Sequence, residues 1–217
     1  LTLTGSGEMS DYDDGNQAPW YGKTVTSVVM DSNITQIGKM AFYECTGLKS
    51  ITIPQNVTVI GEEAFGGCSG LNSISVASGN AAFCVSGGIL YNKAMTEIIK
   101  CPAGYSATSL TIGNTVTTIG LGAFEGCSSL QTVTIPANVT TISDFAFDNC
   151  TSIETVLIDE NSKLKTIGDG AFYGNNISEI ILPKSITSIG GKAFWTSKTS
   201  SLTIRYRGTE AEWNNIT

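Results

Sequence analysis

The apolar residues of this chain recur with a period near 23 residues, and one short string carries them in each copy. That string is Ile-Gly-x-x-Ala-Phe-x-x-Cys, with Ser143 in the glycine place of the fourth copy and with Asn175 and Ser197 in the cysteine place of the last two. A repeat of this length predicts a solenoid, in which each coil is a small unit stacked on the next. The six copies occupy residues 37–45, 60–68, 119–127, 142–150, 167–175 and 189–197.

Between the strings, apolar and hydroxyl residues alternate in the pattern Leu-x-x-Ile-x-Ile-Pro-x-Asn-Val-Thr-x-Ile, as in residues 48–60. This alternation, rich in β-branched residues, predicts a short strand with one buried face. Pro54, Pro136 and Pro183 end the strand because proline cannot donate to a ladder. The Gly-x-x-Ala-Phe segment is too short for a sustained helix, so we expect one helical or 3₁₀ turn there. The predicted fold class is α/β: a right-handed stack of coils with a parallel β-sheet on one face and short helical turns on the other.

Residues 71–109 interrupt the period, since the second and third copies start 59 residues apart. This stretch holds apolar runs at 82–85 and 89–91, joined by Ser86-Gly87-Gly88, and a third run at 98–102. Two runs joined by a Gly-Gly turn predict a hairpin. We therefore expect an enlarged coil with a small antiparallel meander, and not a second domain.

The repeat string resembles that of the BspA-like, or Treponema-type, bacterial leucine-rich repeat family. The resemblance runs from about Val25 to Leu202, and the ends also look familiar: residues 5–9 and 18–21 resemble the family's entry segment, and residues 206–209 with 212–213 its usual ending. It implies a leucine-rich repeat solenoid at 25–206, an amino-terminal cap at 1–24 and a carboxy-terminal tail at 207–217. It also implies an extracellular or cell-surface protein that adheres to host extracellular proteins or to other microbes.

The composition excludes several kinds of chemistry. The chain has no histidine, so histidine bases, histidine-dependent nucleophiles and histidine metal ligands are all excluded. A net charge of −7 argues against a nucleic acid as partner. No stretch approaches the ~18 apolar residues of a membrane span. Because the sequence begins at Leu1 without an apolar leader, we expect a signal or anchor segment to lie outside it.

Four cysteines share one place in the repeat, which allows three interpretations. Their thiols would lie along a line, ~5 Å apart per coil, and would not converge on the tetrahedron that zinc needs. Neighbouring pairs, Cys45 with Cys68 and Cys127 with Cys150, lie within conceivable reach of a disulfide. The favoured interpretation is a column of small buried thiols, in which Asn175 and its counterpart one coil later are polar substitutes that bond to loop backbone. We predict no metal site and no cofactor.

An asparagine column accompanies the strands at Asn33, Asn56 and Asn138. In a solenoid such a side chain bonds to the backbone of its turn and satisfies groups that stacking would otherwise leave without partners. Each of these asparagines also begins a glycosylation sequon. We interpret those matches as by-products of the repeat, because a buried ladder cannot carry a glycan.

Acidic side chains offer two further candidate sites. Residues 11–16 are similar to a calcium loop, but Gly15 and Gly22 stand where oxygen ligands are needed, so we predict a solvated acidic turn. Paired carboxylates are the enzymatic option that remains without histidine, yet those of the turn segments lie at variable offsets and predict no shared cleft. We therefore predict no catalytic residue and no enzyme activity. The carboxylates considered are Glu62, Glu63, Glu125, Asp144, Asp148 and Asp169.

The outward positions of the predicted sheet are the remaining candidate site. Side chains alternate along a strand, so the residues on either side of the first Ile point away from the core. Most are Ser or Thr, with an apolar, acid-tinged patch near Leu157, and Ser201 with Thr203 form the expected outward pair of the last coil. Ser and Thr also suit a strand that faces only water, so the alternative interpretation is a solvated face that binds no ligand. The candidate ligand-binding residues are Thr132, Thr134, Thr155, Leu157, Glu179 and Ile181.

These features predict a monomeric, non-enzymatic module that binds a protein partner through its sheet face. Two alternatives stay open: a structural stalk that presents another domain, and a glycan-binding module. For glycan binding, aromatic platforms should line the sheet. Trp20, Trp195 and Trp213 are instead expected in the cap, a helical turn and the tail.

Overall fold

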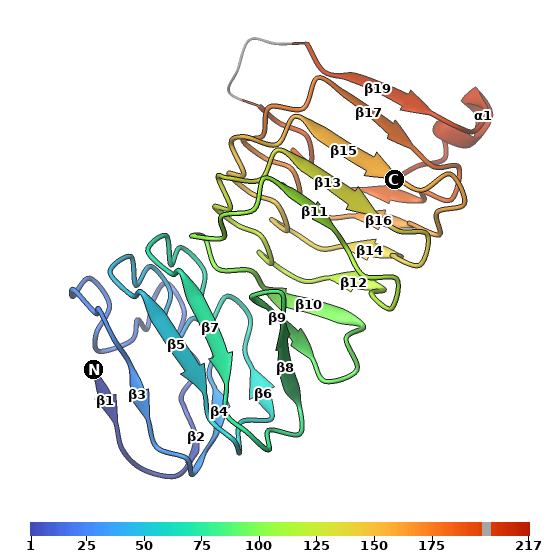
Figure 1. Cartoon of the computed structure of the whole chain (residues 1–217). Helices are drawn as coiled ribbons and strands as arrows, with labels where there is room; N and C mark the ends of the chain where they lie inside the picture. The colour runs from blue at the N-terminus through green and yellow to red at the C-terminus, as the bar shows by residue number, and fades with distance from the viewer. Residues whose placement is uncertain (197–200) are drawn as a thin grey trace. The chain divides into compact units, whose positions relative to one another are not determined.

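The computed structural model describes residues 1–196 and 201–217, which form nineteen short strands and one short helix (Figure 1). The chain divides into two compact units. The N-terminal unit comprises residues 1–95 and 99–105, and the C-terminal unit comprises residues 96–98 and 106–217. The division falls inside the enlarged coil at 71–109, and the domain limits expected from the sequence stay a prediction.

The N-terminal unit contains two ladders of parallel strands and one hairpin. In the first ladder β1 pairs with β3 and β5 pairs with β7; in the second, β4 pairs with both β2 and β6. The hairpin of β8 and β9 is antiparallel, as predicted. The first ladder is β1 Thr2–Leu3, β3 Val29–Met30, β5 Ser50–Ile53 and β7 Ser73–Val76; the second is β2 Gly7–Glu8, β4 Ile34–Ile37 and β6 Val59–Ile60; the hairpin is β8 Phe83–Ser86 and β9 Ile89–Asn92.

The C-terminal unit contains two ladders of its own, each with five strands that lie side by side in Figure 1. Strands of the first ladder are the ones that the Leu-x-x-Ile-x-Ile pattern predicts. The second ladder lies at the Val-Thr-x-Ile end of each repeat, where we expected only a return of the chain. The third apolar run of the enlarged coil enters it as β10, which pairs in parallel with β12. The first ladder is β11 Ser109–Thr111, β13 Thr132–Ile135, β15 Thr155–Ile158, β17 Glu179–Leu182 and β19 Thr203–Tyr206; the second is β10 Glu97–Lys100, β12 Thr118–Ile119, β14 Thr141–Ile142, β16 Thr166–Ile167 and β18 Ser188–Ile189.

The predicted helical face is wrong. Among the described residues the only helix is α1, Glu210–Trp213, and the Gly-x-x-Ala-Phe segments are chains of hydrogen-bonded turns. In the first copy Met40 and Glu44 have φ of 51° and 54°, in the left-handed region. A left-handed residue at every fourth place breaks a helix, at a cost of about 1–2 kcal/mol each when it is not glycine.

Backbone bonds between coils compensate for these left-handed residues. The amides of residues 40, 42 and 44 donate to the carbonyls of residues 62, 64 and 66 in the next coil, at 2.9, 2.8 and 2.8 Å. The C-terminal unit repeats the arrangement, for example from Phe147 N to Ala171 O at 2.8 Å. The turn side is thus a third series of inter-coil bonds, and the fold is a β-solenoid of leucine-rich repeat type.

Stacked phenylalanines fill the core of both units. Phe124, Phe147 and Phe172 are almost fully buried, and adjacent rings are nearly parallel with centroids 4.8 and 5.1 Å apart. Phe194 continues the stack at 5.5 Å. In the N-terminal unit Trp20 stacks on Phe42, which stacks on Phe65.

Both ends of the chain take part in the stack. Residues 1–24 form a partial coil, because β1 and β2 join the two ladders and Trp20 Nε1 donates to Ala41 O at 2.7 Å. At the other end, Thr209 and Glu212 form a capping box at the start of α1. Thr217 then pairs with the second ladder, since Ile189 N donates to its carbonyl at 2.7 Å.

Candidate interaction surface

The cysteine column forms hydrogen bonds between coils inside the core. The thiols of Cys68 and Cys150 donate to the phenylalanine carbonyl one coil earlier, at 3.1 and 2.9 Å. Asn175 makes the same bond through Nδ2, to Phe147 O at 2.9 Å. All six cysteines lie in the described part of the chain and are thiols, and burial raises the pKa of the Cys45 thiol. The column therefore presents no reactive surface. Ser197, predicted to substitute in the same way, lies outside the described residues.

The asparagine column is exposed, so the argument that burial protects the sequons is wrong. Asn33, Asn56 and Asn138 all lie at the surface. Asn56 Nδ2 donates to Ser32 O and Asn138 Nδ2 to Asn114 O, both at 2.9 Å. The asparagine stands at the outer edge of its turn, where its amide reaches the preceding coil while the side chain stays in water.

A second buried asparagine besides Asn175 is Asn80, which the sequence analysis missed. Its Nδ2 donates to Pro54 O and Val57 O, and its Oδ1 accepts from Ala82 N and Phe83 N, all within 2.7–2.9 Å. Asn80 lies four residues after Val76, as Val57 lies four after Ile53, so it replaces the core valine of the repeat. That substitution was the available signal.

A threonine column was also missed. The hydroxyls of Thr117 and Thr140 donate to the carbonyl one coil earlier in the second ladder, at 3.2 and 3.1 Å, and Thr187 does the same. The repeated Thr directly after the core residue Val116, Val139 or Ile186 was its signal in the sequence.

The candidate sheet face follows the first ladder of the C-terminal unit, whose strands are aligned residue by residue. Thr132 lies opposite Thr155, and Thr134 opposite Leu157. Glu179 lies opposite Thr203, and Ile181 opposite Arg205. Leu157 is 52 % exposed and Ile181 is 40 % exposed, on the neighbouring strands β15 and β17. Thr155 and Glu179 are exposed, whereas Thr132 and Thr134 are half-buried.

Two details of this face differ from expectation. The outward pair of the last coil is Thr203 and Arg205, so the predicted register was two residues early. Arg205 forms an ion pair with Glu179, so the patch near Leu157 is neutral and not acid-tinged. Thr203 lies nine residues after Phe194, whereas Glu179 lies seven after Phe172, so the segment before β19 is longer than its counterpart in the preceding coil.

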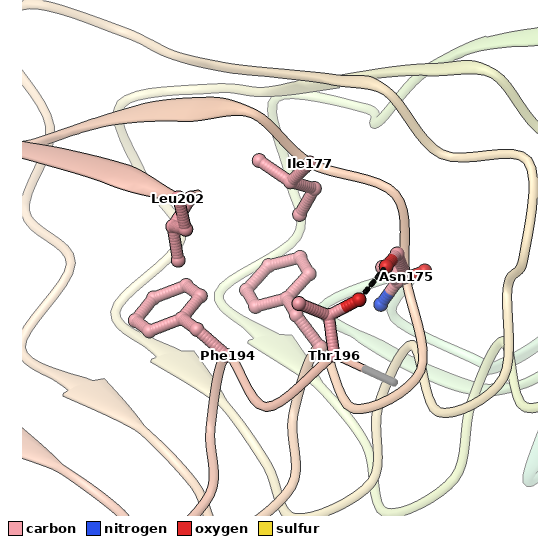
Figure 2. A pocket seen from close by; sticks show the side chains of 6 residues that line it. Asn175, Ile177, Phe194, Thr196 and Leu202 are labelled. Carbon is pink, nitrogen blue, oxygen red and sulfur yellow. Dashed lines mark hydrogen bonds between the residues drawn. The ribbon is translucent and has the colours of Figure 1, made fainter. Parts of the chain in front are cut away.

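A small pocket lies at the C-terminal end of the phenylalanine stack. Figure 2 shows Ile177, Phe194 and Leu202 around it, with Thr196 donating its hydroxyl to the main-chain carbonyl of Asn175 at 3.0 Å. Asn175 Oδ1 is buried there and has no partner among the described residues. Phe172 completes the lining. The pocket is apolar apart from these few atoms and presents no group with acid–base or nucleophilic character.

Carboxylates on the turn side accept hydrogen bonds from backbone amides of the next coil. Asp144 Oδ1 accepts from Asp169 N at 2.8 Å, and Asp169 Oδ1 accepts in turn from Gly191 N. In the acidic turn, Asp13 Oδ1 accepts from the amides of Gly15 and Asn16, both at 2.8 Å. Within residues 1–196 and 201–217, no three Cys, Asp or Glu side chains are placed to hold a metal ion. Over the same residues, no helix has the length and apolarity to cross a membrane.

Comparisons with known proteins support the fold. A family model described as BspA type leucine rich repeat region, in six copies, matches residues 16–99 and 99–212. A leucine rich cell surface protein from Faecalibacterium prausnitzii A2-165 is 23 % identical, with a TM-score of 0.76 over 98 % of this chain and 62 % of that one. The pneumococcal vaccine antigen PcpA is 20 % identical, with a TM-score of 0.71 over 94 % of this chain and 58 % of that one. This chain therefore spans about three fifths of either protein. Comparison with curated proteins found no match.

Proposed function

This chain belongs to the BspA-type leucine-rich repeat family, and on that premise we propose that it is a non-enzymatic module for protein interaction. The resemblance drawn from the repeat string is thereby confirmed. We propose that the module acts at the bacterial cell surface or after secretion, as a monomer, and adheres to host extracellular proteins or to other microbes. The cell-surface protein among its structural neighbours supports that location.

The observation that carries the proposal is the pair Leu157 and Ile181. Two large apolar side chains are exposed on the neighbouring strands β15 and β17, on a face where Ser and Thr occupy most outward positions. Exposed apolar residues grouped on one face mark a contact surface more often than scattered ones do. The Glu179–Arg205 ion pair borders the group and leaves it without net charge, which suits a partner surface that is apolar at its centre and polar at its rim.

Binding of the purified protein to host-cell matrix and to whole bacteria tests this proposal. The double variant Leu157→Arg, Ile181→Arg should weaken binding at least about tenfold, because a central apolar contact contributes more than ~1.4 kcal/mol. Val59→Arg is the matched control, since Val59 is 47 % exposed but lies on β6 in the second ladder. Undiminished binding by the double variant would refute the sheet-face assignment. A wild-type protein that binds neither target would favour the structural stalk.

A further inference from the structure

A second exposed surface lies on the turn side of the C-terminal unit, where three successive coils each carry an aromatic side chain. Phe145 is 43 % exposed, Trp195 is 48 % exposed, and Tyr173 between them is partly exposed. The rings of Tyr173 and Trp195 stack with centroids 4.8 Å apart. We call these three residues the aromatic strip. The strip is separate from the buried stack, which the phenylalanines of the repeat string form, so the core does not account for its exposure.

Phe145 occupies a position that the neighbouring coils give to glycine. Its φ is 54°, and the equivalent Gly122 and Gly170 have φ of 56° and 58°. A bulky residue rarely adopts this backbone conformation. A Cβ added to Gly170 would stand 2.8 Å from two ring atoms of Phe145 and 3.7 Å from Tyr173 Cβ. The Phe145 ring therefore lies over Gly170 and extends the strip from its own coil to that of Tyr173.

The turn segments that carry the strip are acidic. Residues 119–127, 142–150, 167–175 and 189–196 contain four carboxylates, and Lys192 is their single basic side chain. Asp144 directly precedes Phe145, and Asp169 directly precedes the glycine beneath its ring; both side chains are exposed. The remaining carboxylates are Glu125 and Asp148.

We propose that the aromatic strip binds an arginine- and lysine-rich segment of a partner protein. A guanidinium or ammonium group is attracted to the face of an aromatic ring, and arginine also stacks on it. The surplus of carboxylates adds attraction for the same cations and repels acidic ligands. A neutral sugar could stack on the rings but would gain little from the surplus charge. This surface differs from the neutral sheet face in both charge and residue type, so the two would select different partners.

The test measures binding of a labelled octa-arginine peptide by fluorescence anisotropy at low and physiological salt. Phe145→Gly and Trp195→Ala should each weaken binding by about two- to fivefold, the effect of one exposed cation–π contact. Asp169→Asn keeps an oxygen for Gly191 N but removes a charge, so it should weaken binding and flatten the salt dependence. Val59→Ser, which removes an exposed apolar side chain from β6 in the N-terminal unit, is the control and should bind like the wild type.

Phe145→Gly should fold, because the equivalent residues of the neighbouring coils are glycines with nearly the same φ. Circular dichroism checks that the variant is folded. Trp195→Ala provides an independent variant. Equal peptide binding by both ring variants and the wild type would overturn the proposal, since binding would then follow net charge alone. Binding of uncharged maltohexaose or chitohexaose that depends on Phe145 and Trp195, without octa-arginine binding, would also overturn it, in favour of a glycan site.

Discussion

Substitution of Asn80 is the clearest test of how buried side-chain hydrogen bonds stabilise the enlarged coil. It is 2 % exposed, and its amide forms four hydrogen bonds to backbone groups on both sides of the coil. These use both hydrogens of Nδ2 and both lone pairs of Oδ1, so the side chain is fully satisfied. The substitution Asn80→Ala leaves two carbonyls and two amides without those partners.

The expected loss in the free energy of unfolding follows from the number of hydrogen bonds removed. A hydrogen bond of this kind contributes about 0.5–1.5 kcal/mol net, and a buried group left without a partner costs more. Water that enters the vacated space reduces the summed cost of the four lost hydrogen bonds. We therefore expect Asn80→Ala to destabilise the N-terminal unit by about 3–4 kcal/mol. Asn56→Ala removes a single bond from an exposed side chain, which water can replace. We expect that variant to lose only about 0.5–1 kcal/mol.

Urea unfolding followed by Trp20 fluorescence measures the difference. Trp20 packs on Phe42 in the N-terminal unit, and changing Trp195 and Trp213 to Phe in every variant confines the signal to that unit. With a slope of about 1–3 kcal/mol per molar urea, Asn80→Ala should lower the midpoint by about 1–4 M. Equal midpoints for Asn80→Ala and Asn56→Ala would refute the reasoning, because burial would then not determine how much stability is lost when the asparagine is removed.

Three further outcomes are expected. Gly168→Ala should destabilise by about 1–3 kcal/mol in urea, because the added Cβ would stand 2.2 Å from Asp144 Oδ1 and 2.5 Å from Asp144 N; an unshifted midpoint would contradict the tight contact between coils. Cys150→Ser should retain more stability than Cys150→Ala because it keeps a donor to the preceding coil, and a reducing agent should leave the melting temperature unchanged, whereas a drop would reveal a disulfide. The bonds that Glu212 accepts from Thr209 N and, to a lesser extent, from Thr209 Oγ1 lower the pKa of its carboxyl, so its contribution to α1 is present above the ordinary glutamate pKa and is lost as the pH falls through the lowered one. Thr209→Ala removes only the hydroxyl bond and should raise that pKa partway in an NMR titration; an unchanged pKa would exclude the hydroxyl as a contributor.

Much of the first ladder and the core could be predicted because a solenoid converts periodicity into columns. Residues one repeat apart must stack, so the recurring Cys predicted a line of small buried groups. The outward position of Leu157 and Ile181 followed from strand alternation in the same way. The last coil shows the limit, since one change of spacing before β19 moved Arg205 into the place expected for Thr203.

The turn segments could not be predicted because their conformation has little signature in the residues. Met40, Glu44 and Phe145 are ordinary residues that do not favour a positive φ, yet all three adopt one. Local preference alone would have allowed a helical turn. The bonds from their amides to the carbonyls of the next coil select the left-handed conformation, and those bonds exist only in the stack.

The sequence by itself determined the family, the repeat, the parallel first ladder and the absence of histidine chemistry, because each depends on residue identity and spacing along the chain. The tertiary structure decided the second ladder, the left-handed turns, the burial of Asn80, the neutral Glu179–Arg205 pair and the grouping of Phe145, Tyr173 and Trp195. All of these depend on which backbone groups and side chains meet between coils. A period predicts that such neighbours exist, but only their packing decides which of them form bonds and which remain exposed to a partner.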